Sequence, residues 1–111
     1  MILIEVERNY IGNIYRFNVE GHANSTDDDK MDCICAIVST ATQSAVLGMA
    51  EILDIKLDLV MGDGLLKCTI PEIDDSETLG KVNILVETML LALQQVSEQY
   101  PSYVKLSEME E

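Results

Sequence analysis

The stretch that decides the fold is "IKLDLVMGDGLLKCTIPEI", residues 55–73. Apolar and polar residues alternate on both sides of the "GDG" at residues 62–64, and such a short Asp-Gly turn between alternating segments is typical of a β-hairpin. Pro71 cannot donate a backbone hydrogen bond to a sheet, so the second strand should end before it. The stretch therefore predicts two antiparallel strands joined by a tight turn.

A second hairpin is predicted nearer the N-terminus. The segment "ILIEVER", residues 2–8, alternates so that Ile2, Ile4 and Val6 share one face. The segment "IYRFNVEGH", residues 14–22, alternates again, and the Asn and Gly residues of "NYIGN" between the two segments favour a turn. The strands of each hairpin must pair antiparallel, so the sequence predicts a mostly antiparallel sheet.

Each hairpin is followed by a segment with helical periodicity. In residues 35–53 an apolar stripe recurs at helical spacing, and Asp32 is the predicted N-cap. The stripe consists of Val38, Ala41, Ala45, Met49 and Ile52. Residues 74–100 carry a second stripe, formed by Leu79, Val82, Val86, Met89, Leu93 and Val96. Pro101 should end that helix, "SYVKLSE" at residues 102–108 reads as a final strand, and the "EMEE" tail should fray.

The predicted order of elements is therefore ββαββαβ. Strands and helices do not alternate one by one along this order, and the two hairpins are antiparallel. The order therefore predicts an α+β fold, with a mostly antiparallel sheet packed with two helices. The chain has 111 residues, which suits a single domain with one core over residues 1–111.

Composition excludes several classes of partner. The net charge is −13 with only seven Lys and Arg residues, which argues against nucleic acid and against anionic membrane surfaces. We expect no segment long enough to cross a bilayer, and a basic protein fits the charge better as a partner. Three cysteines and no visible secretory signal predict free thiols in the cytoplasm.

Two residues could carry nucleophilic chemistry. Cys35 lies at the predicted helix start, where unpaired N–H groups favour a thiolate and could bind an oxyanion. His22, the one histidine, ends a predicted strand and could serve as the base. Ser39, one turn beyond Cys35, could orient either partner.

Other interpretations of these residues remain open. Cysteines at helix starts are often small buried hydrophobes, and Cys68, within a strand, is best explained by packing. A zinc site from His22, Cys33, Cys35 and Cys68 fits poorly, because zinc-binding cysteine pairs usually have two to four residues between them. The aspartates at residues 27–29 lack the glycine and glutamate of a calcium loop. No metal or cofactor is predicted.

Two motifs taken together resemble the ribosomal-processing cysteine protease (Prp) family. They are "GHA" at residues 21–23 and the pattern D-x-x-C-A-x-V-S, present as "DCICAIVS" at residues 32–39. The resemblance extends over essentially the whole chain, including an amphipathic helix that leads into "YPSYV" at residues 100–104. It implies a cytoplasmic, homodimeric cysteine endopeptidase without a cofactor. Its substrate would be a ribosomal protein precursor, whose N-terminal extension it removes.

The resemblance also implies roles for individual residues. Cys35 would be the nucleophile and His22 the base, while residues 23–31 would form a flap. The supporting residues would be Gly21, Ala23, Asp32, Ala36 and Ser39. The chain departs from the family at Lys30, where a glycine is usual, and at Cys33, where an aliphatic residue is common. The alternative hypothesis is a non-catalytic, ribosome-associated module that binds a basic protein.

Overall fold

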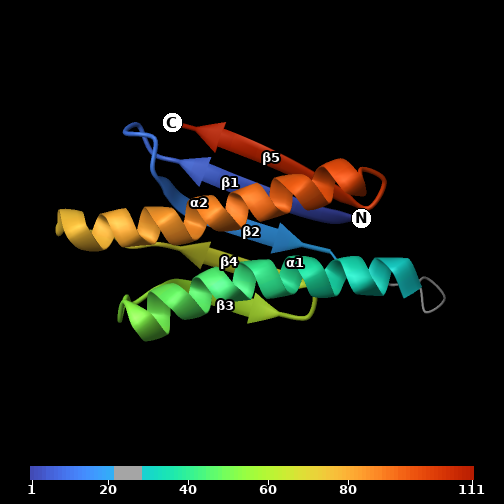
Figure 1. Ribbon diagram of the computed structural model, residues 1–111, viewed down its shortest axis with the longest axis horizontal. Coiled ribbons are helices and arrows are strands. Elements are labelled where there is room, and N and C mark those ends of the chain that lie inside the picture. The colour runs from blue at the N-terminus through green and yellow to red at the C-terminus, as the bar shows by residue number, and fades with distance from the viewer. Residues whose placement is uncertain (22–28) are drawn as a thin grey trace.

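The computed structural model describes residues 1–21 and 29–111, and its elements follow the predicted ββαββαβ order (Figure 1). The strands and helices, in chain order, are β1 (Ile2–Arg8), β2 (Ile14–Glu20), α1 (Asp29–Leu47), the π-helical turn η1 (Gly48–Ile52), β3 (Asp58–Gly62), β4 (Leu65–Thr69), α2 (Ser76–Gln99) and β5 (Val104–Glu110). The predicted order is confirmed.

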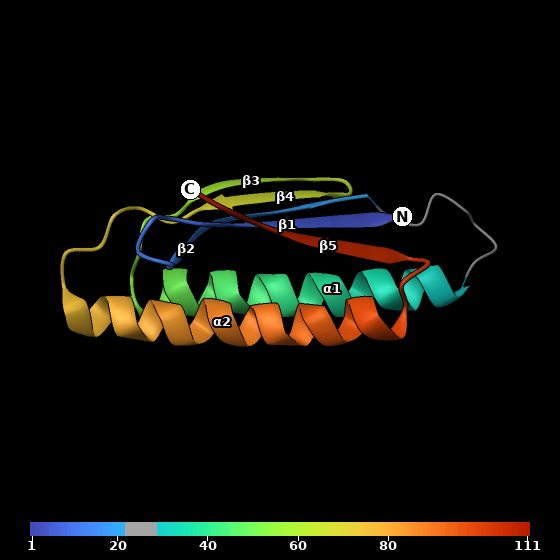
Figure 2. The same ribbon diagram turned by 90° about the horizontal axis from the view of Figure 1, so that it is seen from above.

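The five strands form one mixed sheet in the order β3-β4-β2-β1-β5. Three neighbouring pairs are antiparallel, and only β1 and β5 are parallel. Both helices lie on the same face of the sheet, as Figure 2 shows, and run side by side along it. The chain is thus an α+β domain with a mostly antiparallel sheet, as predicted.

The core lies between the helices and the covered face of the sheet. Ile2, Ile4 and Val6 of β1 are buried there, as the alternation predicts. On β2 strict alternation fails, because Ile14 and Phe17 are both buried. The register shifts between Glu7 and Arg8 of β1, which pair with Arg16 and Ile14, so one residue of β2 has no partner in the ladder. This bulge brings Ile14 to the same face as Phe17.

The first helix begins earlier than predicted. α1 starts at Asp29, so Asp32 lies inside the helix and the prediction that it is the N-cap is wrong. Acidic residues are favourable in a first helical turn because they face the positive end of the helix dipole, and Lys and Met propagate a helix well. The helix therefore extends back into the end of the segment 23–31 that was expected to form a flap. Cys35 is consequently its seventh residue.

The far end of this helix widens into the π-helical turn η1. The N–H of Leu53 bonds to the carbonyl of Gly48 at 3.2 Å, five residues back. Val38, Ala45 and Met49 of the predicted stripe are buried, but Ile52 is 80% exposed, so its assignment to the stripe is wrong. A π turn holds more residues than an α turn, which rotates Ile52 away from the core.

The same segment corrects our expectation about membrane-spanning length. Asp32–Ile52 is 21 residues long and contains an 18-residue window with a mean hydropathy of 1.6, so by length and composition it could cross a bilayer. A helix in a protein core has the same composition. Here Ile34 and Val38 are 1% exposed against the rest of the core, so one apolar face of this helix is used in packing.

The second helix and last strand close the domain. Asp75 caps α2 by accepting the N–H of Thr78 at 3.1 Å. Five of the six residues of the predicted α2 stripe are buried in the core, and the sixth, Leu79, is half-buried. The tail does not fray as predicted: β5 continues to Glu110, and Glu108 accepts a bond from Arg8 Nε at 3.1 Å.

Candidate active site

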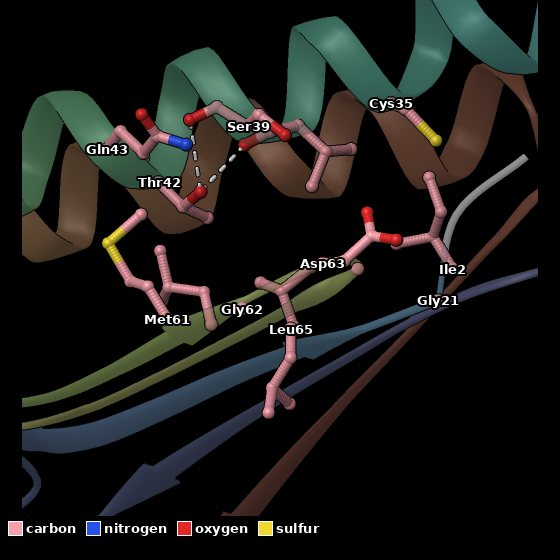
Figure 3. A pocket seen from close by; sticks show the side chains of 14 residues that line it. Ile2, Gly21, Cys35, Ser39, Thr42, Gln43, Met61, Gly62, Asp63 and Leu65 are labelled. Carbon is pink, nitrogen blue, oxygen red and sulfur yellow. Dashed lines mark hydrogen bonds between the residues drawn. The ribbon is translucent and has the colours of Figure 1, made fainter.

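A cavity of about 250 Å³ lies between α1 and the β3–β4 hairpin (Figure 3). We call it the Cys35 cavity. It brings together three predicted site residues: Cys35 and Ser39 from α1, and Gly21 from the end of β2. Cys35 is half-buried and Ser39 is exposed. They are one helical turn apart, so their side chains share a face of α1.

The α1 wall of the cavity continues beyond Ser39 as a polar surface. Thr42, only 2% exposed, donates its hydroxyl to the carbonyls of Val38 at 2.9 Å and Ser39 at 3.2 Å. Gln43 follows it along the wall (Figure 3). The Cys35 cavity is therefore open along the helix, with Cys35 toward its N-terminal end.

Gly21 fixes the path of the chain out of β2. Its φ angle is +104°, a conformation that residues with a Cβ rarely adopt. A Cβ at this position would also collide with the carbonyl oxygen of Met1. The Gly21 N–H donates to the carbonyl of Gly64 at 2.9 Å. The backbone is thus held in place directly before His22, whereas His22 itself and Ala23 lie outside the described residues, as does most of the proposed flap at residues 23–31.

The remaining predicted residues of α1 do not line the Cys35 cavity. Asp32 and Ala36 are both exposed. The two departures from the family pattern are exposed as well. Lys30 places its Nζ 5.9 Å from the centre of the Tyr100 ring, within the range of a cation–π contact. Cys33 lies two residues before Cys35 on the same helix and does not line the cavity.

The position of Cys35 overturns one argument for its reactivity. Only the first four N–H groups of a helix lack an intrahelical acceptor, and the dipole effect is confined to the first turn. Cys35 is the seventh residue of α1, so neither unpaired amides nor the helix end can act directly on its sulfur. Activation of this thiol would have to come from another group.

Cys68 is explained by packing, as predicted. It is fully buried in β4 and belongs to the core cluster. Burial, reinforced by the negative charge of Asp58, raises the pKa of the Cys68 thiol to about 12. A thiol that remains protonated and shielded from solvent is chemically inert.

Within residues 1–21 and 29–111, no group of three or more His, Cys, Asp or Glu side chains is placed to hold a metal ion. The zinc site considered from the sequence includes His22, which is outside these residues. Of its three cysteines, Cys68 is buried in the sheet, while Cys33 and Cys35 differ in exposure on α1.

Sequence reasoning missed the opposite wall of the Cys35 cavity. This wall is the turn of the β3–β4 hairpin, with Met61, Gly62, Asp63 and Gly64. The "GDG" motif was interpreted only as a turn signal, and nothing in its spacing connects it to Cys35. The connection depends on the sheet order, in which β4 pairs with β2 and so brings the turn beside Gly21.

A half-buried thiol in an open cavity, on a helix packed against a five-stranded sheet, is an arrangement suited to a cysteine-dependent hydrolase. The family model described as cysteine protease Prp matches residues 1–105. The chain belongs to this family and is a cysteine protease.

Individual relatives extend over nearly the full chain. The ribosomal processing cysteine protease Prp of Bacillus subtilis (strain 168) is 26% identical over 109 residues, in a match that covers 96% of this chain and 96% of that protein. The crystal structure of SMU.848 from Streptococcus mutans has a TM-score of 0.86 at 27% identity, covering 100% of this chain and 99% of that one. The Prp protease of S. aureus in complex with a substrate peptide has a TM-score of 0.83 at 20% identity, covering 97% and 99%.

Proposed function

We propose that the protein is a cytoplasmic endopeptidase that removes the N-terminal extension of a large-subunit ribosomal protein, with Cys35 as nucleophile and His22 as base. One observation carries the assignment of the nucleophile. Of the three cysteines, only Cys35 lines the cavity, since Cys33 is exposed elsewhere on α1 and Cys68 is buried. The substrate class is supported by the Bacillus subtilis relative, which is named a ribosomal processing protease.

The reaction follows from the chemistry of a thiol and an imidazole. His22 takes the thiol proton, and the Cys35 sulfur attacks the carbonyl carbon of the scissile bond, forming a C–S bond. The peptide C–N bond then breaks, and His22 gives the proton to the departing amine. Water, deprotonated by His22, hydrolyses the thioester and restores the free thiol. Ser39 is a positioning residue in this scheme, because its side chain lies one turn from Cys35 on the cavity wall.

The charge of the protein supports a basic substrate. A net charge of −13 attracts a positively charged ribosomal protein over several ångströms and speeds productive encounters. This attraction weakens as salt screens it, whereas the chemistry at Cys35 does not depend on it.

The direct test is cleavage of a peptide that spans the junction between extension and mature ribosomal protein. The native protein should produce two fragments that mass spectrometry identifies. Cys35→Ala should lower kcat/KM by about a thousandfold or more, because the nucleophile is absent. Cys33→Ala is the matched control and should retain most activity. Cleavage retained by Cys35→Ala, or peptide binding without turnover by the native protein, would favour the non-catalytic binding module.

We also propose that the protein is a homodimer, as the family resemblance implies. The outer face of the two helices exposes large apolar side chains, including Leu47 at 58%, Ile84 at 69% and Leu91 at 63%. Burying these against a second copy would remove them from water. Light scattering should give the mass of two chains, and Leu91→Glu should shift it toward one chain. A single-chain mass for the native protein at micromolar concentration would contradict the proposal.

A further inference from the structure

The turn of the β3–β4 hairpin carries the one charged side chain among the described residues that line the Cys35 cavity. This side chain is Asp63, and every other described lining residue is apolar, a glycine or a neutral polar residue. Figure 3 shows the Asp63 carboxylate projecting from the turn toward the α1 wall, on the side of Cys35. Among the described lining residues, a single anionic group thus faces the cavity.

The position of Asp63 is fixed by the backbone on both sides. Gly62 pairs with Leu65 at the end of the hairpin, and the Gly64 carbonyl accepts the Gly21 N–H at 2.9 Å. The turn is therefore attached to the strand end that precedes His22. A charged group on such a rigid support acts from a defined position on whatever occupies the cavity.

The Asp63 carboxylate has no ion-pair partner among the described residues. The Nζ of Lys67, on β4, instead lies 3.9 Å from Oε1 of Glu20. An ionised carboxylate only accepts hydrogen bonds, and its strongest partners are ammonium and guanidinium groups. Asp63 is exposed, so such a pairing has the modest strength of a surface ion pair.

We infer that Asp63 is a specificity-determining residue that binds a Lys or Arg side chain of the peptide, within the few residues flanking the scissile bond. This inference rests on the proposed peptidase function and deepens it. This role differs from the general acidity of the protein, because Asp63 is the one carboxylate among the described residues that lines the cavity and would contact a single position of the substrate.

The test uses the junction peptide and a series in which each Lys or Arg is replaced singly by Gln or by Glu. For the native protein, neutralising one basic position should lower kcat/KM about two- to fivefold, the range expected of an exposed ion pair. In Asp63→Asn, which suits a turn, that position should no longer matter. In Asp63→Lys, the peptide with Glu at that position should become the preferred substrate.

Asp58→Asn is the matched control, because it removes the same charge from the opposite end of β3 and should leave the discrimination unchanged. Three outcomes overturn the inference. Unchanged discrimination by Asp63→Asn refutes it while leaving the peptidase function intact. An equal loss of kcat/KM on all peptides would instead assign Asp63 to the catalytic machinery. Failure of the native protein to cleave any peptide removes the proposed function itself, and the inference with it.

Discussion

The backbone N–H of Gly21 and the carbonyl of Gly64 form a hydrogen bond of 2.9 Å. This bond joins the end of β2, directly before His22, to the turn that carries Asp63. Two segments more than 40 residues apart in sequence thereby meet at one edge of the Cys35 cavity. The geometry of this junction can be tested by changing Gly21.

Gly21→Ala should destabilise the fold by about 2 kcal/mol or more and reduce peptide cleavage. Its φ of +104° is unfavourable for alanine, and the new Cβ would collide with the Met1 carbonyl. Gly12→Ala is the matched control, because Gly12 has a φ of +101° but nothing within 4 Å of an added Cβ, so it should cost only about 1 kcal/mol. Urea unfolding measures the loss of stability in both variants. An equal loss in the two would show that the collision with the Met1 carbonyl does not contribute.

The three cysteines should react with an alkylating reagent at three distinct rates. A thiol paired with a base reacts faster, so Cys35 should be modified about tenfold or more faster than the exposed Cys33. Cys68 should react only after unfolding. Mass spectrometry of timed samples measures each rate. His22→Ala should slow Cys35 to the rate of Cys33 without affecting Cys33, and identical rates for both in the native protein would argue against the pair.

Removing the charge of Glu87 should destabilise the protein by about 1–2 kcal/mol. Arg8 donates two bonds to Glu87, at 2.6 and 2.9 Å, and one to Glu108, which ties β1 to α2 and β5. The bonds to Glu87 raise the pKa of Arg8 further above its ordinary value. Glu87→Gln tests this by urea unfolding.

The matched control for this ion pair is on the same helix. Glu77 and Lys81 form an exposed pair at 3.5 Å, and Glu77→Gln should change stability by no more than about 0.5 kcal/mol. If Glu87→Gln and Glu77→Gln lowered the free energy of unfolding by the same small amount, the bonds of Arg8 to Glu87 would not contribute to stability.

The stability of the native protein should fall at alkaline pH because of Cys68. Its thiol pKa rises from 9.0 to about 12 on folding, so between these values the unfolded chain loses a proton that the folded chain retains. Stability then falls by up to about 1.4 kcal/mol per pH unit above pH 9, and below pH 9 the thiol has no effect.

The Cys68→Ala variant isolates the contribution of the Cys68 thiol to the pH dependence of stability, because all other ionisable groups of the variant are those of the native protein. The variant should be less stable at pH 8, since it leaves a cavity in the core, but the difference from the native protein should shrink as pH rises. Urea unfolding at several pH values measures this difference. A constant difference from pH 8 to 11 would contradict the raised pKa.

Much of the fold could be predicted because local patterns and the final packing agree. Alternation placed Ile2, Ile4 and Val6 on the buried face, and helical spacing identified the buried stripe of α2. The Asp-Gly turn located the β3–β4 hairpin. These signals are strong because each repeats over several residues and each repeat is satisfied by the same core.

The failures occurred where one residue depends on a distant partner or where the local backbone departs from the expected helix. Burial of Ile14 beside Phe17 requires the bulge against β1, and exposure of Ile52 requires the π turn. The helix start at Asp29 rather than beyond Asp32 reflects propensity in a segment without periodicity. The role of Asp63 in the cavity wall depends on sheet order, which no local pattern encodes.

The parallel pairing of β1 with β5 also has a consequence for biosynthesis. β1 is an inner strand, yet one of its two neighbours is made far later, since Arg8 and Glu108 are 100 residues apart. During translation, one edge of β1 therefore remains unpaired until β5 has been made. By then, every described element that lines the cavity has already been synthesised. A contact of such long range slows folding, so closure of the sheet should be a late event that occurs after the site has been assembled.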